Sequence, residues 1–211
     1  MLIDFKQIPI FWYGGIKQGR KENITKMFSR LGLNATHVEP VLSNSIRIGC
    51  SASHLKVLQI ALEIDGPVLI LEDDVCETQW YNSTYEIPDD SDSFYFGTCH
   101  NGIHHNWKNM GADGGCCSDP IMLEKYEKYY RIHGMLTTHA ILYCSKKYKK
   151  DCYDLLKQND GKRYLDVLFA SKMNRYRVYA PKQPLFFQDC KNDNLDAYEK
   201  TKKPLKDLFE K

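Results

Sequence analysis

Three consecutive acids are the strongest chemical signal in the sequence. Glu72, Asp73 and Asp74 directly follow an apolar strand pattern, Pro-Val-Leu-Ile-Leu, at residues 67–71. Ligands of open α/β sheets bind beyond the carboxyl ends of the strands, and Mg²⁺ and Mn²⁺ prefer carboxylate and phosphate oxygens as ligands. The triplet therefore predicts a site for a divalent cation that carries a phosphorylated ligand. A solvated acidic turn after the strand is the alternative interpretation.

A second candidate segment precedes this strand, at residues 49–55, with the sequence Gly-Cys-Ser-Ala-Ser-His-Leu. We expect a helix to begin at Ser51 or Ser53, because serine is favoured at helix N-caps. Free backbone N–H groups at such a start suit an anion. Ser53 and His54 are therefore candidate ligand-binding residues, and the alternative is an ordinary helix cap with a structural histidine.

Two further acids are candidates for the reaction centre. Asp166 lies near an expected helix start, where a carboxylate is easily kept ionised. There it could act as a base on a hydroxyl group or stabilise positive charge at a sugar carbon. Asp189 is the second candidate. The alternative for Asp166 is a helix N-terminal acid without a chemical role.

The elements that must position these residues alternate along the first part of the chain. Strand patterns at residues 8–13, 36–42 and 67–71 are separated by two helical patterns, which predicts parallel strands joined by crossovers. Further strands are expected at 93–97, 138–144 and 176–180. No internal repeat or linker interrupts the 211 residues, so we expect an α/β fold in a single domain.

The composition excludes several classes of protein. Lys and Arg number 29 against 27 Asp and Glu, which is too balanced for nucleic-acid binding through bulk charge. No apolar stretch approaches the ~18 residues that a membrane span requires. The first residues lack the pattern of a signal peptide, so we expect a cytoplasmic protein whose eight cysteines are reduced.

Taken in order, these motifs resemble those of glycosyltransferase family 25, the lipooligosaccharide and collagen galactosyltransferase type. The resemblance spans roughly residues 8–189. The small size of the chain also resembles that of glycosyltransferase domains encoded by large algal viruses such as chlorella viruses. The matching segments are Gly49-Cys50 with Ser53-His54-Leu55, Leu71-Glu72-Asp73-Asp74-Val75, Phe94-Tyr95-Phe96-Gly97, Thr137-Thr138-His139-Ala140, Asp166-Val167-Leu168 and Pro184 to Gln188.

The resemblance implies a GT-A fold with a mostly parallel central sheet and a nucleotide-sugar donor. The acidic triplet is similar to the family's DxD-type motif. By this analogy Asp74, with Glu72, binds Mn²⁺ or Mg²⁺, while Asp73 and Glu72 hold the ribose or metal-bound waters. Residues 1–97 would form the nucleotide-sugar half, residues 98–190 the acceptor half, and residues 195–211 a Lys-rich tail.

The same analogy assigns further donor-binding residues. Phe11, Tyr13 and Gly14 would flank the base, with Tyr13 stacking on it, and Arg20 would reach the diphosphate. His139 becomes a site residue through its Thr-His-Ala context. The Asn-Leu-Asp-Arg opening of the family is replaced here by Phe-Trp-Tyr-Gly-Gly at residues 11–15.

The long segment at residues 98–120 carries cysteines and histidines in pairs. Its pairs are Cys99-His100, His104-His105 and Cys116-Cys117, whose spacing matches no standard zinc finger. We expect this segment to line an acceptor pocket or to form a lid, with Trp107 available to stack on a sugar. A structural zinc site is the alternative.

The sequence therefore predicts a metal-dependent glycosyltransferase that uses a UDP-sugar donor, carrying a hexose or deoxyhexose, and a glycan acceptor. Two other classes remain open. A sugar nucleotidyltransferase would need a Gly-rich basic loop early in the chain, of which Gly14-Gly15 with Lys17, Gly19 and Arg20 is a faint version. A non-catalytic, zinc-stapled glycan-binding module would use the Cys/His segment. The chain could also be part of a longer protein with further domains.

Overall fold

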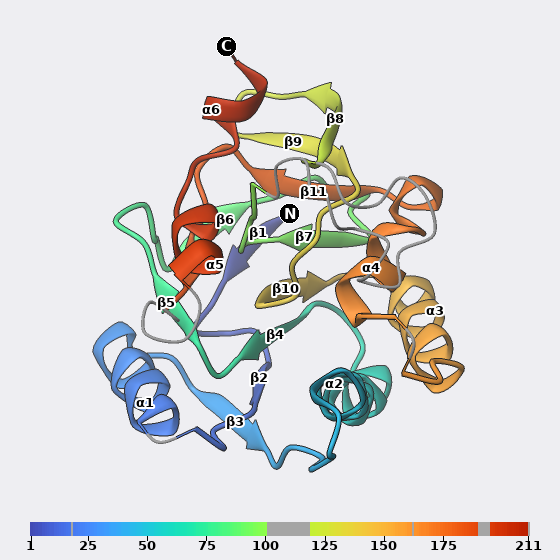
Figure 1. Cartoon of the computed structure of the whole chain (residues 1–211). Helices are drawn as coiled ribbons and strands as arrows, with labels where there is room; N and C mark the ends of the chain where they lie inside the picture. Colours follow the sequence, from blue (N-terminus) through green and yellow to red (C-terminus); the bar gives the residue numbers. More distant parts are fainter. Residues whose placement is uncertain (18, 101–118, 162, 190–194, 211) are drawn as a thin grey trace.

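The strand that carries the acids, β4 (Val68–Glu72), lies inside an eight-stranded sheet. The protein is described by a computed structural model that covers residues 1–17, 19–100, 119–161, 163–189 and 195–210. In the sheet the strand order is β3-β2-β4-β10-β7-β11-β9-β8. The α/β fold class expected from the sequence is confirmed, with the sheet between helices on both of its faces (Figure 1).

Alternating side chains of the central strands fill two separate cores. In β4, Val68 and Ile70 pack into one core, whereas Leu69 and Leu71 pack into the other. All four are fully buried. A strand buried on both faces reads as a continuous apolar run, which is why the sequence of β4 shows no polar alternation.

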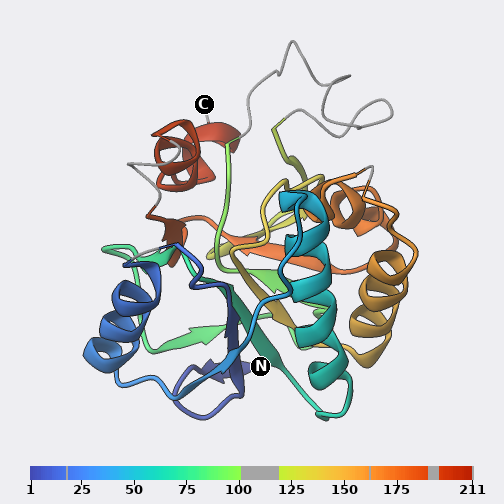
Figure 2. The same cartoon turned by 60° about the horizontal axis from the view of Figure 1, so that its bottom comes forward.

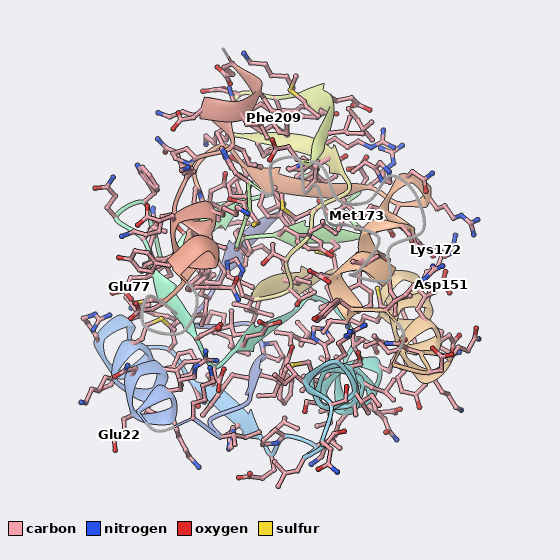
Figure 3. All side chains as sticks on the ribbon, in the orientation of Figure 1. Glu22, Glu77, Asp151, Lys172, Met173 and Phe209 are labelled. Atoms are coloured by element: carbon pink, nitrogen blue, oxygen red, sulfur yellow. The ribbon has the colours of Figure 1, made fainter. Side chains whose placement is uncertain are left out.

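Helices cover the two faces unequally. Helices α2 (Ile46–Leu62), α3 (Lys146–Lys157) and α4 (Leu165–Ala170) lie together on one face, and α1 (Arg20–Leu31) lies on the other (Figures 1 and 2). Arg30 at the end of α1 donates a 2.9 Å hydrogen bond to Glu77, which lies beside this helix (Figure 3).

The expectation of a mostly parallel sheet is wrong in detail. Strand β2 (Ile10–Tyr13) is parallel to its neighbours β3 (Ala35–Val38) and β4, as the crossover pattern predicts. However, β10 (Ala140–Tyr143) runs antiparallel to both β4 and β7. The sheet is therefore mixed, because a fully buried antiparallel strand has the same apolar sequence pattern as a parallel one.

Two smaller pairings complete the fold and hold the chain ends. Strand β1 pairs with β6, and β12 pairs with β5, both antiparallel. No helix among the described residues is long and apolar enough to cross a membrane. The remaining elements are β1 (Leu2–Asp4), β5 (Val75–Glu77), β6 (Thr84–Glu86), β7 (Ser93–Tyr95), β8 (Ile121–Lys125), β9 (Tyr129–His133), the short helix η2 (Met173–Arg175), β11 (Val178–Pro181), β12 (Phe186–Gln188), α5 (Leu195–Thr201) and α6 (Lys206–Phe209).

The start of α2 differs from the sequence prediction. The helix begins at Ile46 with Ser45 as its N-cap, and Ser51 and Ser53 lie inside it. The side chain of Ser45 makes no capping hydrogen bond. The prediction of free backbone N–H groups near Ser53 and His54 is therefore wrong, because the backbone there is already helical.

Candidate functional site

The carboxyl ends of β2 and β4 bring the candidate residues together. The two strands are parallel neighbours in register, with Tyr13 opposite Glu72. The chain leaves β2 through Gly14 and leaves β4 through Asp73, so both loops emerge at the same edge of the sheet. This is the edge at which α/β sheets bind ligands.

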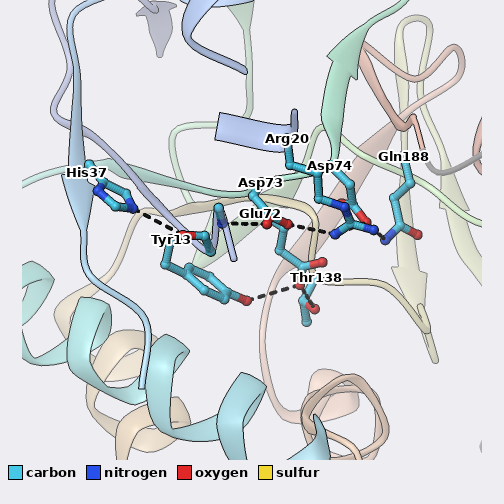
Figure 4. A network of polar contacts seen from close by, with 10 residues as sticks. Tyr13, Arg20, His37, Glu72, Asp73, Asp74, Thr138 and Gln188 are labelled. Atoms are coloured by element: carbon cyan, nitrogen blue, oxygen red, sulfur yellow. Dashed lines mark hydrogen bonds and ion pairs between the residues drawn. The ribbon is translucent and has the colours of Figure 1, made fainter. Parts of the chain in front are cut away.

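Asp73 holds the loop that follows β2. Its Oδ2 accepts a 2.5 Å hydrogen bond from the backbone N–H of Gly15, and its Oδ1 accepts a 2.8 Å hydrogen bond from Arg20 (Figure 4). Gly14 adopts φ +111°, and a Cβ atom there would lie only 2.5 Å from Cγ of Asp73. The close approach of this carboxylate therefore requires glycine at position 14.

Asp74 presents the most unusual environment of the three acids. Its side chain is 9% exposed, and Oδ1 is buried without a hydrogen-bond partner among the described residues. Its Oδ2 lies 3.3 Å from the guanidinium of Arg20 and 3.5 Å from the amide nitrogen of Gln188. Burial raises the pKa of Asp74 to about 6, although Arg20 opposes this shift. A buried carboxylate oxygen without a partner is a place where a cation would be stabilised.

The residues fit a shared metal site rather than a closed protein site. Among the described residues no group of three or more His, Cys, Asp or Glu side chains could hold a metal ion. Mg²⁺ characteristically binds through one or two carboxylates and completes its octahedron with water and substrate phosphates. Asp74 can supply such a carboxylate, so the site fits a cation that arrives with a diphosphate.

Glu72 lies at the centre of a chain of hydrogen bonds. Its Oε1 accepts from the hydroxyl of Tyr13 at 3.1 Å and from the hydroxyl of Thr138 at 2.5 Å (Figure 4). His54 lies between Tyr13 and Tyr143, with Nδ1 3.0 Å from one hydroxyl and Nε2 2.7 Å from the other. A hydroxyl has only one proton to donate, and the Tyr13 hydroxyl donates it to Glu72. Nδ1 of His54 must therefore carry the imidazole proton and donate it to the Tyr13 oxygen.

Burial determines the protonation states of the residues in this series of hydrogen bonds. It lowers the pKa of His54 to about 3, which keeps the imidazole neutral. It also raises the pKa of Glu72 to about 8, with a smaller contribution from the neighbouring Asp74 carboxylate. Tyr13 is therefore a fixed part of the wall, since it is 5% exposed and bonded at its hydroxyl, and His54 is fully buried behind it.

Two adjoining cavities open on this edge. The first, which we call the strand-end cavity, has a volume of about 440 Å³ and extends from Gly14 and Arg20 past Leu42 to the acidic triplet. The second, the Asp166 cavity, has a volume of about 170 Å³. Its walls include Arg47, Thr138, Tyr164, Asp166 and Gln188. Ile46, Cys50 and Glu72 line both, so the two cavities meet at the acidic triplet.

The cavities separate the predicted site residues into two groups. Those that line a cavity are Tyr13, Gly14, Arg20, Ser53, Glu72, Asp73, Asp74 and Asp166. Ser53 has a structural bonding pattern there, because its hydroxyl donates to the Gly49 carbonyl and accepts from the Val41 N–H. Asp166 accepts a hydrogen bond from the Val167 N–H at 2.8 Å, and burial raises its pKa.

Four predicted site residues line neither cavity, and one of them is His54, the buried histidine between Tyr13 and Tyr143. Phe11 packs into the core. His139 is fully buried, with Nε2 3.3 Å from the Phe186 carbonyl, and a Cβ atom at Gly97 would overlap its ring. Asp189 is exposed and contacts the site only through its backbone N–H, which donates to the Asp74 carbonyl at 2.5 Å.

Sequence reasoning missed several residues that line the cavities. Arg47 lies 4.8 Å above the Tyr164 ring, and Thr138 donates to Glu72. The signal for Thr138 was its place next to His139, but the hydroxyl rather than the imidazole reaches the site. The Cys and His pairs at residues 104–105 and 116–117, expected to line an acceptor pocket or to form a lid, lie outside the described residues, as does Trp107.

Comparison with known proteins supports the fold. A crystal structure of a glycosyltransferase involved in the glycosylation of the major capsid of PBCV-1 matches with a TM-score of 0.51 and 14% sequence identity, covering 91% of this chain and 97% of that one. The nucleoside-diphosphate-sugar pyrophosphorylase from Vibrio cholerae RC9 gives a TM-score of 0.43 at 10% identity, covering 83% and 73%. CTP:phosphocholine cytidylyltransferase from Streptococcus pneumoniae gives 0.45 at 9% identity, covering 86% and 72%.

At these identities the similarity concerns the fold alone. No family model and no curated protein matches the sequence. The GT-A-like arrangement expected from the motifs is supported by the first of these structures. The resemblance to family 25 stays a prediction from the motifs.

Proposed function

We propose that this protein is a metal-dependent glycosyltransferase, which transfers a hexose or deoxyhexose from a UDP-sugar to a hydroxyl of a glycan acceptor. The observation that carries the proposal is the pair of cavities that meet at Glu72 and Cys50, beside Oδ1 of Asp74, which has no hydrogen-bond partner among the described residues. A transferase of this type needs two substrate sites that adjoin at the bond to be exchanged.

The strand-end cavity suits the donor. Asp74 would hold a Mn²⁺ or Mg²⁺ ion through Oδ1, with Glu72 as a second carboxylate of this cavity wall, and the diphosphate would supply further oxygens. When bound, the metal offsets the negative charge that develops on a departing diphosphate. Arg20, 3.3 Å from Asp74, adds a second positive charge at the same place.

The nucleoside has room at the other end of this cavity. Ile16 and Leu42 line it and are 65% and 74% exposed, so their apolar side chains are available to a planar base. The preference for uridine over guanosine rests on the family resemblance. Asp73 fixes the intervening loop through Gly15, which positions the backbone along which the diphosphate would lie.

The Asp166 cavity suits the acceptor. Asp166 can accept the proton of an acceptor hydroxyl, and burial raises its pKa, which makes the carboxylate a stronger base. Arg47, Thr138 and Gln188 surround it with donors that match sugar hydroxyls. The acceptor hydroxyl and the donor sugar would then meet beside Glu72.

The proposal is tested by release of UDP. We expect the purified protein to release UDP slowly from at least one UDP-hexose or UDP-deoxyhexose when Mn²⁺ is present, and not after chelation. Asp74→Asn should abolish this release. Asp89→Asn is the matched control, since the side chain of Asp89 is 90% exposed. Absence of both UDP release and a UDP-dependent thermal shift across such a panel would refute the proposal.

A sugar nucleotidyltransferase is the second candidate. The loop after β2 contributes Gly14 and Lys17 to the strand-end cavity, and the start of α1 contributes Arg20, as a basic phosphate-binding loop would. Such an enzyme would release pyrophosphate from UTP and a sugar phosphate, whereas a glycosyltransferase releases UDP. Identification of the released product by ion-exchange chromatography distinguishes the two.

A further inference from the structure

A third cavity of about 300 Å³ lies outside the two described above. It is formed by the loop after β5, the β8–β9 turn, the β11–β12 connection and the start of α6. None of its lining residues lines the strand-end cavity or the Asp166 cavity. We call it the Trp80 cavity, and the residues that matter below are Trp80, Tyr85, Lys128, Lys182, Gln183 and Lys206.

Hydrogen bonds between separate segments hold the walls of this cavity. Thr78 bonds the β11–β12 connection twice, from its N–H to the Leu185 carbonyl at 2.9 Å and from its hydroxyl to the Pro184 carbonyl at 2.6 Å. The Lys128 carbonyl accepts from the Tyr85 hydroxyl at 2.9 Å and from the Lys182 N–H at 3.1 Å. Because its walls are already fixed, binding of a ligand costs little conformational entropy in the protein.

The exposed chemistry of the cavity combines aromatic rings with hydrogen-bonding groups. The Trp80 indole N–H donates to none of the described residues, and Lys206 has no ion-pair partner among them. The Tyr85 ring is held in place by a tilted contact with Phe94 and an edge contact with Phe96. An aromatic plane with donors and acceptors at its rim complements a pyranose, whose C–H face is apolar and whose hydroxyls lie at the edge.

The charges favour a neutral ligand over a phosphate. Lys182 pairs with Glu210 at 2.9 Å, and Lys128 lies 3.5 Å from Glu86. Glu127 adds another carboxylate to the cavity wall. With Lys206, the three lysines therefore face three carboxylates, which is a poor environment for an anion.

The position of the cavity connects it with the acceptor side of the site. Leu185 lines the Trp80 cavity, and Gln188 at the end of β12 lines the Asp166 cavity. The two residues are three positions apart in an extended segment, which corresponds to about 10 Å along the backbone, the length scale of a short oligosaccharide.

We infer that the Trp80 cavity is a second saccharide subsite, which binds a neutral pyranose unit of the acceptor glycan away from the point of transfer. This inference rests on the proposed function for the identity of the glycan as acceptor. It also explains why half-buried aromatic and amide groups line a cavity that takes no part in donor binding.

The subsite is tested by NMR of the ¹⁵N-labelled protein. The chain has three tryptophans, and the Trp80→Phe variant identifies the indole signal of Trp80. The probes are the methyl glycosides of glucose, galactose, mannose, xylose and rhamnose, each up to about 100 mM, because single sugars bind weakly. We expect at least one to shift the Trp80 signal in a saturable way, while the signal of the buried Trp12 stays constant.

Matched lysine variants locate the effect. Lys206→Gln should weaken the apparent affinity several-fold, whereas Lys202→Gln should not, because the Lys202 ammonium lies over the Tyr198 ring outside this cavity. A Trp80 signal that no pyranoside shifts would overturn the inference. So would a signal that inorganic phosphate shifts at a lower concentration than any sugar.

The outcome is separable from that of the proposed function. UDP release from a donor with Mn²⁺ does not involve the Trp80 cavity, and binding of a methyl glycoside does not require transfer. UDP release without a Trp80 shift would refute the subsite alone. A Trp80 shift in a protein that turns over no donor would refute the proposed function and leave a saccharide-binding site.

Discussion

The contact between Gly14 and Asp73 gives the sharpest prediction about the architecture of the site. In the Gly14→Ala variant the new Cβ would lie 2.5 Å from Cγ of Asp73, at a backbone φ of +111°. Strain of a side chain in this region costs about 1–3 kcal/mol. Asp73 must also move, which weakens its hydrogen bonds to the Gly15 N–H and to Arg20.

Gly66→Ala is a matched control for this variant. Gly66 also has a positive φ, +91°, but a Cβ there meets nothing within 4 Å. It therefore carries the backbone strain without the steric contact. We expect Gly14→Ala to lose about 1–3 kcal/mol more than Gly66→Ala, since a displaced hydrogen bond to a charged group costs about that much.

Urea unfolding measured by circular dichroism gives both free energies of unfolding. UDP affinity in the presence of Mn²⁺ should fall in Gly14→Ala and stay unchanged in Gly66→Ala. Equal free energies of unfolding for the two variants would refute the reasoning, because the steric contact would then have no cost.

Three further predictions concern Lys149, His54 and Cys50. Lys149→Met should lose about 2 kcal/mol in urea unfolding, because the buried ammonium donates to the Ile64 and Gly66 carbonyls at 2.8 and 2.7 Å; Lys150→Met, which removes an exposed pair, should lose less than about 1 kcal/mol. His54 has its pKa lowered to about 3 by burial, so the folded state binds fewer protons than the unfolded state below pH ~6.5 and stability falls as the pH decreases, by up to about 1.4 kcal/mol per pH unit. His54→Gln should show a shallower loss of stability between pH 6 and pH 4, a range that lies below the free His pKa of about 6.5. An unchanged slope would contradict this account. The pKa values of Cys50 and Cys76 are both raised to about 12, but only Cys50 lines the cavities. UDP with Mn²⁺ should therefore slow maleimide labelling of Cys50 and leave the labelling of Cys76 unaffected, as peptide mass spectrometry would show.

The central part of the fold follows from the sequence because its buried strands appear as continuous apolar runs. Strand β4 is buried on both faces, so its apolar run and the acids after it could be identified directly. The parallel pairing of β2 with β3 and β4 followed from the helices between successive strands, which need crossovers. The direction of β10 did not follow, since a buried strand looks the same in either direction.

The errors arose where local signals were weak or ambiguous. The start of α2 was placed too late, because Ser51 and Ser53 look like caps, whereas the actual cap residue Ser45 makes no side-chain bond. The β8–β9 hairpin was missed, because the residues of β8 are mostly exposed and two of the five are charged. Such an edge strand lacks the apolar alternation that identifies a strand in a sequence.

The sequence predicted which residues belong to the candidate site better than it predicted the contacts between them. Asp74 and Arg20 could be chosen from the acidic triplet and the early basic residues. The hydrogen bonds that join Tyr13, His54 and Tyr143 connect three separate elements, so no local spacing reveals them. The same holds for His139, whose place beneath Gly97 depends on the pairing of distant strands.

The most direct test of the account is a crystal structure of the protein with UDP and Mn²⁺, in which anomalous scattering locates the metal. We predict one Mn²⁺ ion in direct contact with Oδ1 of Asp74 and with the diphosphate, and the uridine in the strand-end cavity. A Mn²⁺ ion bound away from Asp74, or UDP bound outside the strand-end cavity, would contradict the central claim.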